Sequence, residues 1–108
     1  MTAIRRVFGV RAMLVVVSYD VDTTDAAGRR RLRRIARTCQ DYGQRVQFSV
    51  FECEVTPADW VKIRARLLEE VDLGRDSIRF YFLGAEGRRR VEHAGSRKPV
   101  DLDGALIF

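Results

Sequence analysis

The sequence has few of the residues on which several common kinds of active site depend. It contains one histidine, His93, and two cysteines, Cys39 and Cys53. A single histidine excludes metal sites built from paired histidines, and no spacing supports a Ser–His–Asp triad. The separation of the two cysteines fits no zinc site, and their apolar surroundings predict buried free thiols. The chain also lacks the Gly-Lys-Ser/Thr loop that binds nucleotide phosphates.

Long apolar runs are absent as well. No run approaches the roughly 20 residues that a helix needs to cross a bilayer. Residues 1–12 are too short, and too often interrupted by arginine, for a signal peptide, so we expect a basic N-terminal extension. With 108 residues, 46% hydrophobic and 32% charged, the chain has room for one folded domain. We therefore predict a cytoplasmic domain without membrane association.

Lysine is scarce, and arginine carries the positive charge. Only two of the twenty basic residues are lysines, fifteen residues are acidic, and the pI is near 9.9. Arginine presents forked donors that suit phosphate, so the net charge of +5 favours a polyanionic partner such as DNA or RNA. A merely soluble surface from an arginine-rich genome is the alternative. Seven arginines and one aspartate between residues 26 and 46 concentrate the charge in one segment.

Apolar periodicity predicts an α+β domain over residues 13–95. The order strand–helix–strand–strand–helix–strand is typical of the ferredoxin-like fold, with two helices on one face of an antiparallel sheet. The other face needs a cover, which favours a homodimer with facing sheets and a C-terminal tail, residues 96–108, packed on the partner subunit. The predicted elements are a strand at 13–19, a polar turn at 20–25, a helix at 28–42 capped by Gly43, two strands within 44–55 separated by a bend, bulge or reversal near Val50–Phe51, a helix from 56–59 to Gly74, a strand at 78–83 and a short strand at 91–93.

The candidate catalytic and metal-binding residue is Asp20, directly after the first apolar strand. A carboxylate at this point has a rigid support and access to water. One carboxylate holds Mg²⁺ weakly, because the ion prefers six oxygen ligands, so two copies of Asp20 facing each other across a two-fold axis would make a shared site. Tyr19, Asp22 and Arg45 are candidate supporting residues. The alternative is that Asp20 is an ordinary turn or capping residue.

The predicted helix at 28–42 is the candidate nucleic-acid-binding element. Its arginines lie mostly off the apolar stripe, and phosphate contacts of this kind position a nucleic acid without reading its sequence. A solvated helix face is the alternative. Tyr19, Phe48 and Tyr81 are able to stack on bases, although packing inside the sheet is the expected fate of each. The candidate phosphate-binding residues are Arg29, Arg30, Arg33, Arg34 and Arg37.

Several motifs together carry a resemblance to a known family. They are Leu14–Val21, which ends in Tyr-Asp-Val, Arg31–Ala36, and Tyr42–Cys53, which contains Gln-Phe-Ser-Val-Phe-Glu. With Val91–His93 and the tail at 101–108, the sequence from Met13 onward resembles the CRISPR-associated endonuclease Cas-two family, the second of the two universal adaptation proteins. The tail is similar to the subtype I-C branch.

The resemblance implies a ferredoxin-like homodimer with Mg²⁺- or Mn²⁺-dependent nuclease activity on RNA or DNA. The family's metal aspartate closes the first strand within Tyr-Asp-Val, which corresponds to Asp20, and one such residue from each subunit would share the ion. The resemblance also implies a partner, the CRISPR integrase subunit. Two functions stay open: an endonuclease that takes part in spacer integration, and a non-catalytic DNA-binding dimer that scaffolds the integrase. A toxin-like or general RNA-binding module is a third interpretation.

Overall fold

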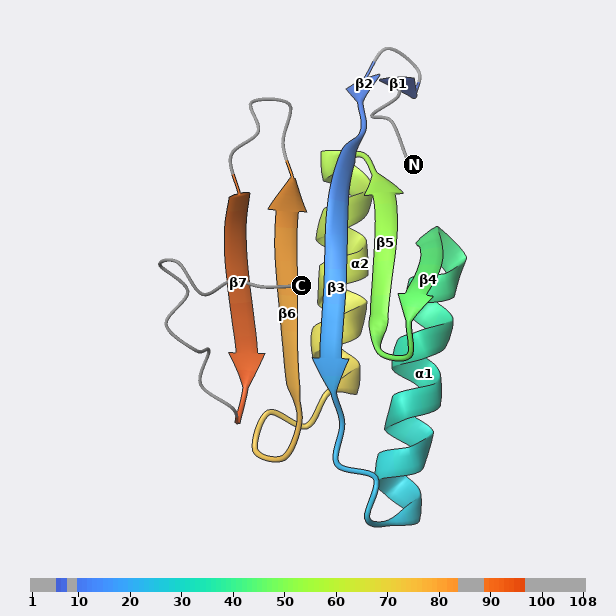
Figure 1. The fold of residues 1–108 in the computed structure, drawn as a ribbon, viewed down its shortest axis with the longest axis vertical. Helices are drawn as coiled ribbons and strands as arrows, with labels where there is room; N and C mark the ends of the chain where they lie inside the picture. The colour runs from blue at the N-terminus through green and yellow to red at the C-terminus, as the bar shows by residue number, and fades with distance from the viewer. Residues whose placement is uncertain (1–5, 8–9, 84–88, 97–108) are drawn as a thin grey trace.

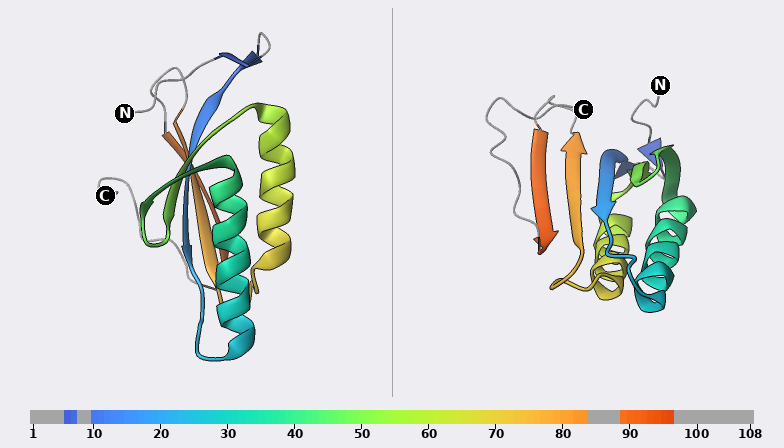
Figure 2. Two further views of the ribbon diagram at one scale, coloured as in Figure 1. Left: turned by 90° about the vertical axis from the view of Figure 1, so that its right-hand side faces the viewer. Right: turned by 60° about the horizontal axis from the view of Figure 1, so that its bottom comes forward.

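The fold is one five-stranded antiparallel sheet with two helices on one face, and the computed structural model describes residues 6–7, 10–83 and 89–96. The strand order is β4-β5-β3-β6-β7, and α1 and α2 lie together against the same side of the sheet (Figures 1 and 2). This confirms the predicted α+β, ferredoxin-like architecture. The main elements are β3 (Met13–Asp20), α1 (Ala26–Tyr42), β4 (Gly43–Gln47), β5 (Val50–Val55), α2 (Pro57–Glu70), β6 (Ser77–Leu83) and β7 (Arg89–Gly95).

The central strand, β3, determines where Asp20 lies. Val15 and Val17 are fully buried, and Tyr19 is 5% exposed, because these alternate residues face the helices. Asp20 belongs to the other alternation, so it lies on the sheet face away from the helices, at the end of the strand. In the β3–β6 ladder it pairs with Ser77. The central strand therefore ends in a carboxylate that is exposed to solvent.

Helix α1 begins two residues earlier than predicted and ends at Tyr42, as predicted. Asp25 caps it, because its Oδ1 accepts a hydrogen bond of 2.8 Å from the Gly28 amide. Ile35 and Cys39 are buried on the predicted apolar stripe. Gly43 occupies the predicted C-cap position, but its backbone is extended, not left-handed as in a typical glycine cap, and it opens β4 directly. Its lack of a side chain serves close packing instead, since a Cβ there would lie 2.2 Å from the carbonyl oxygen of Glu52.

The bend, bulge or reversal predicted near Val50–Phe51 is a tight turn between β4 and β5, and it lies slightly earlier in the chain than predicted. The turn lies at residues 48–49, and the register of the hairpin shifts between Arg45 and Gln47. Its apolar side chains face solvent: Val46 is 52% exposed and Phe48 is 88% exposed. The expectation that Phe48 packs inside the sheet is therefore wrong. The same expectation is confirmed for Tyr19 and Tyr81, which are 5% and 4% exposed.

Helix α2 starts as predicted and stops before Gly74. The Thr56 hydroxyl accepts a hydrogen bond of 3.2 Å from the Asp59 amide, and Pro57 occupies the first turn. Trp60 packs edge-on against two phenylalanines of β6, Phe80 and Phe82, with ring centroids 4.9 and 5.5 Å apart. The helix ends at Glu70, and Gly74 belongs instead to the turn between α2 and β6.

The remaining predictions concern the ends of the chain and the thiols. Residues 6–7 and 10–11 form a two-residue antiparallel pair, β1 (Arg6–Val7) and β2 (Val10–Arg11), which the sequence did not predict. The tail after residue 96 and the loop at 84–88 lie outside the described residues. Cys39 and Cys53 are free and buried, as predicted, and burial raises the pKa of Cys53 to about 11. No helix in the described part of the chain has the length and apolarity to span a membrane.

Candidate metal and nucleic-acid site

Asp20 lies in a shallow hollow at the C-terminal end of β3. Asp22, Arg75, Ser77 and Ser96 line the same hollow. Asp20 also lines a second hollow, together with Ser18 and Arg79 among others. The carboxylate is exposed, while the backbone that carries it is held on both sides. Asp20 belongs to the β3–β6 ladder, and the amide of the preceding residue, Tyr19, donates a hydrogen bond of 3.1 Å to the carbonyl of Ser49.

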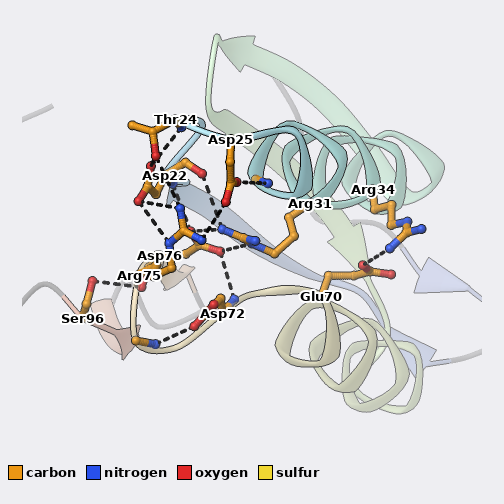
Figure 3. A network of polar contacts seen from close by, with 12 residues as sticks. Asp22, Thr24, Asp25, Arg31, Arg34, Glu70, Asp72, Arg75, Asp76 and Ser96 are labelled. Carbon is orange, nitrogen blue, oxygen red and sulfur yellow. Dashed lines mark hydrogen bonds and ion pairs between the residues drawn. The ribbon is translucent and has the colours of Figure 1, made fainter.

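A buried ion pair fixes the backbone around Asp20. Asp76 has a side chain with no exposed surface, and it accepts a hydrogen bond of 2.8 Å from Nε of Arg31 (Figure 3). Its carboxylate also accepts hydrogen bonds of 2.9 Å from the backbone amides of Asp22 and Asp72. Asp22 follows Asp20 by two residues, and Asp76 precedes the ladder partner of Asp20. The pair therefore connects the turn after β3 to the start of β6.

Sequence reasoning missed this pair. Arg31 had no assigned role apart from its place in the arginine-rich segment, and Asp76 lies 45 positions away in a turn with no recognisable motif. Burial opposes ionisation of Asp76, but hydrogen bonds from Arg31 and from the two backbone amides outweigh it, so the pKa of the carboxyl lies below its ordinary value. Asp76 is accordingly a buried anion at neutral pH. The one available signal was that Arg31 falls nearer the apolar stripe than its neighbours do.

The carboxylate of Asp22, a candidate supporting residue, is engaged elsewhere. It accepts hydrogen bonds of 3.0 and 3.1 Å from the guanidinium of Arg75, which also donates to Asp25 at 3.1 Å. The side chain and amide of Thr24 donate to Asp22 as well, and these contacts lower the pKa of Asp22 to about 2. Asp22 therefore shapes the turn beside Asp20, and its own oxygens are committed to Arg75 and Thr24.

These contacts predict loss of stability in acid. The pKa values of Asp22, Asp25 and Asp76 are all lowered in the folded protein. Each ionised carboxylate therefore stabilises the fold at a pH above 3.8, the ordinary pKa of aspartate. That stabilisation is lost as pH falls through the folded values, from about 4 toward the value of about 2 for Asp22. We expect the urea midpoint to be flat from pH 7 to 5 and to fall steeply below pH 4. Replacement of Arg75 by glutamine should make this fall shallower, and a midpoint that is constant to pH 2 would contradict the assignment.

Asp20 suits a divalent cation, but the described residues do not complete a metal site around it. Exposed carboxylate oxygens are ligands that Mg²⁺ and Mn²⁺ accept. Among residues 6–7, 10–83 and 89–96, however, no group of three His, Cys, Asp or Glu side chains is placed to hold a metal ion. Asp22, the nearest carboxylate in sequence, is bound to Arg75. The described residues therefore do not by themselves supply the further ligands that a metal at Asp20 would need.

Four of the five candidate phosphate-binding residues gather in one place. Arg30, Arg33, Arg34 and Arg37 line a single hollow on α1. Arg34 makes one long contact, 3.8 Å from its Nη1 to Glu70, and stays 63% exposed. Arg29 lies apart from this arginine hollow, because its Nη1 donates to the carbonyl of Thr23 at 3.2 Å. In the described structure, the four arginines of the hollow thus form a solvent-exposed basic surface, whereas Arg29 stabilises the turn before α1.

The other supporting candidates, Tyr19 and Arg45, contact each other across the sheet edge. The guanidinium of Arg45 lies over the ring of Phe51, 5.1 Å from its centroid, and Tyr19 stacks on the same ring at 6.2 Å. Burial raises the pKa of Tyr19, Cys39 adds to this effect, and a hydrogen bond with Arg45 partly offsets it. Tyr19 faces the helices while Asp20 faces away from them, so this cluster supports β3 from behind the site.

The fold and the site define an α+β, ferredoxin-like protein with an acidic strand end and an arginine-rich helix. The family described as CRISPR associated protein Cas2 matches residues 13–91. The chain belongs to this family, as its relatives also show. A protein of Chlorobaculum tepidum named CRISPR-associated endoribonuclease Cas2 is 66% identical over 89% of this chain and all of that protein. A protein of Halalkalibacterium halodurans named CRISPR-associated endonuclease Cas2 is 45% identical over the same shares.

Solved structures agree with the fold. The crystal structure of Streptococcus pyogenes Cas2 at pH 6.5 superposes with a TM-score of 0.63 and 61% sequence identity, over 67% of this chain and 87% of that one. A hypothetical protein from Thermus thermophilus gives a TM-score of 0.59 at 34% identity, over 68% and 84% of the two chains. The subtype I-C resemblance of the tail stays a prediction, because the tail lies outside the described residues.

Proposed function

We propose that the protein is a metal-dependent endonuclease of CRISPR adaptation, which hydrolyses phosphodiester bonds of RNA or double-stranded DNA and takes part in spacer integration. The observation that carries the proposal is the exposed Asp20 carboxylate at the end of the central strand, on a backbone fixed by the buried Arg31–Asp76 pair. A reactive group on a rigid support is what positioning of a phosphodiester requires. The endonuclease and endoribonuclease names of the relatives support the same activity.

The proposed enzyme is a homodimer in which two copies of Asp20 hold one Mg²⁺ or Mn²⁺ ion. The face that bears Asp20 also carries the partly exposed apolar residues Leu14, Val16 and Leu83, and no helix among the described residues covers it. A second sheet on this face would bring two carboxylates toward each other, and their repulsion favours a cation between them. A divalent ion in that place lowers the pKa of water and stabilises charge on the attacked phosphate.

The test of the activity is cleavage by the purified full-length protein. Single-stranded RNA, single-stranded DNA and duplex DNA of one sequence are incubated with Mg²⁺, Mn²⁺ or EDTA. Internal cleavage that requires a divalent ion supports the proposal, and a protein that cleaves none of the three under any condition contradicts it. The molecular mass in solution tests the dimer separately, because a strict monomer is unable to place two copies of Asp20 at one ion.

The arginine hollow is proposed to hold the phosphate backbone. Reversal of Arg30, Arg33 and Arg34 to glutamate should weaken binding of any nucleic acid, and should reduce the slope of log K against log salt by about 2 to 3 through lost counterion release. A salt titration of binding measures this slope. The control is Lys62→Glu on α2, an exposed cation outside the hollow, which should change the slope by less than about 1. An unchanged slope in the triple variant would show that the arginines only solvate the helix.

A non-catalytic scaffold for the CRISPR integrase is the second candidate function. It is favoured by one observation: the arginine hollow lies in the helical layer, whereas Asp20 faces away from that layer. DNA held along α1 by charge alone therefore does not need Asp20. If this function is the relevant one, spacer integration in cells survives Asp20→Asn and is lost when the arginines are reversed. Loss of integration in both variants would favour the enzyme.

A further inference from the structure

We propose that Phe48 is a stacking platform for an unpaired nucleobase beside the phosphodiester held at Asp20. The inference rests on the proposed nuclease function and adds a substrate preference to it: single-stranded nucleic acid, or an unpaired segment, over continuous duplex. Phe48 lies in the turn between β4 and β5, outside the arginine hollow and outside the Asp20 hollow. The proposal therefore assigns a role to a residue that the rest of the site leaves unused.

The exposure of Phe48 is unusual for this chain. Its side chain is 88% exposed, whereas Phe51 and Phe80 are fully buried and Trp60 is 7% exposed. Of the aromatic residues in the described ranges, Phe48 alone is classed as exposed; Tyr42 and Phe82 are partly buried against the core. A full ring in water has no structural role in the described fold. Its π-face is available to a flat partner.

The register of the sheet places Phe48 next to Asp20. The β3–β5 ladder runs without a break to the pair Ser18 and Val50. It continues for one more hydrogen bond, 3.1 Å from the amide of Tyr19 to the carbonyl of Ser49. Asp20 directly follows the donor of this bond, Tyr19, and Phe48 directly precedes its acceptor, Ser49. The turn that carries Phe48 lies beside the C-terminal end of β3, where Asp20 ends the strand (Figure 1).

The surroundings of Phe48 fit a nucleobase better than an apolar protein surface. Gln47, which precedes it in the chain, is an exposed amide, and Gln44 and Arg45 are exposed polar side chains on β4, the strand that leads into the turn. Val46 is the other large apolar residue exposed on this hairpin. An aromatic ring beside cationic and amide groups is the composition that single-strand-binding proteins use, because bases stack on the ring while the charge follows the backbone.

The same geometry explains a preference for unpaired bases. In a duplex the faces of the bases are covered by their neighbours, so a protein ring reaches them only if a base leaves the stack. A single strand offers these faces without that cost. Stacking on one aromatic side chain is typically worth a factor of about 10 to 100 in affinity. Phe48 therefore acts on the choice of substrate, while Asp20 acts on the phosphodiester.

The decisive variant is Phe48→Trp in an Asp20→Asn background, which reports contact without any cleavage. Single-stranded oligonucleotides should quench the introduced indole, and the matched duplex should quench it far less. The single-mutant Asp20→Asn protein is the control, because its one tryptophan, Trp60, is 7% exposed and should change little. A mixed ribose and deoxyribose series in the same assay separates RNA from DNA as the source of the base.

Affinities of further variants separate stacking from simple apolar contact. Phe48→Ala should weaken single-strand binding about 10- to 100-fold and change duplex binding by less than about 2-fold. Phe48→Tyr should bind as the parent does, and Phe48→Leu, which keeps the apolar volume without the ring, should behave as Phe48→Ala. Val46→Ala, on the same hairpin, is the matched control and should have little effect.

Three results would overturn the inference while leaving the proposed function intact. One is full binding by Phe48→Leu, and another is equal weakening of single-strand and duplex binding by Phe48→Ala. The third is a fall in the mass of the dimer in Phe48→Ala, which would assign the ring to a contact with a second copy of the chain. Failure of the proposed function has a different signature, because no nucleic acid then binds or is cleaved with Phe48 in place.

Discussion

Replacement of Asp20 by asparagine is expected to reduce metal-stimulated cleavage by at least about 100-fold, because a cation held by two carboxylates supplies several kcal/mol to such a reaction. Asparagine keeps the shape of the side chain and removes the charge that we propose binds the ion. Asp20 ends β3 with an exposed side chain, so the substitution leaves the core untouched. Initial rates with Mg²⁺ or Mn²⁺, for the variant and the parent prepared side by side, measure the effect.

The control for this variant is Asp41→Asn, which makes the same change at an exposed carboxylate near the end of α1. It should cleave at the parental rate. Dimer mass, the unfolding midpoint and nucleic-acid affinity should be nearly unchanged in both variants. If Asp20→Asn cleaves as fast as the parent, the activity comes from another group or from a contaminant, and the catalytic role of Asp20 is wrong.

The overall fold was predictable because its strongest signals are local. The apolar run at 13–19 predicted a central strand, and the stripe that contains Ile35 and Cys39 predicted the buried side of α1. Thr56 and Pro57 marked the start of α2 correctly. Each of these signals depends on residues within a few positions of one another. The order of the elements then restricts the topology to a small number of arrangements.

The failures share a different cause, which is contact between distant segments. Gly43 lies at the predicted cap position, but its extended backbone and its place in β4 depend on close packing against the carbonyl of Glu52 on the neighbouring strand. Phe48 resembled a core residue because it alternates with Val46 and Val50, yet the turn at 48–49 removes it from the sheet. Neither outcome is visible in the local pattern. Residues in a hairpin turn lie outside the ladder, so the alternation of the flanking strands does not predict their burial.

The site was predictable only in part for the same reason. The position of Asp20 at a strand end follows from the run before it, and helical spacing, which is local, brings four of the arginines to one hollow; their role in binding stays a prediction. The partner of Arg31 was not predictable, since Asp76 comes from a turn 45 residues later. The engagement of Asp22 by Arg75, across 53 residues, was equally hidden. The contacts that stabilise the site therefore join residues that are distant in sequence, whereas its candidate functional residues are identified by local sequence patterns.

Loss of that support is expected to have the largest effect on stability. Asp76→Ala would leave Arg31, whose side chain is 14% exposed, without its partner. It would also leave the amides of Asp22 and Asp72 without their acceptor. Removal of one partner from a buried ion pair costs about 3–5 kcal/mol, which is a large part of the 5–15 kcal/mol that holds a typical domain together. Urea unfolding at pH 7 should show a correspondingly lower midpoint.

A matched pair of variants shows whether burial is the cause. Arg75→Gln breaks an ion-pair network in the same turn, but Arg75 is 36% exposed, so its loss should lower the urea midpoint far less than Asp76→Ala does. The double variant Arg31→Met with Asp76→Leu should be more stable than Asp76→Ala, because it removes the uncompensated charge and leaves only the two amides unsatisfied. If Asp76→Ala and Arg75→Gln cost the same, the buried pair is not what holds the backbone beside Asp20. In that case the rigidity of the site must come from the β3–β6 ladder alone.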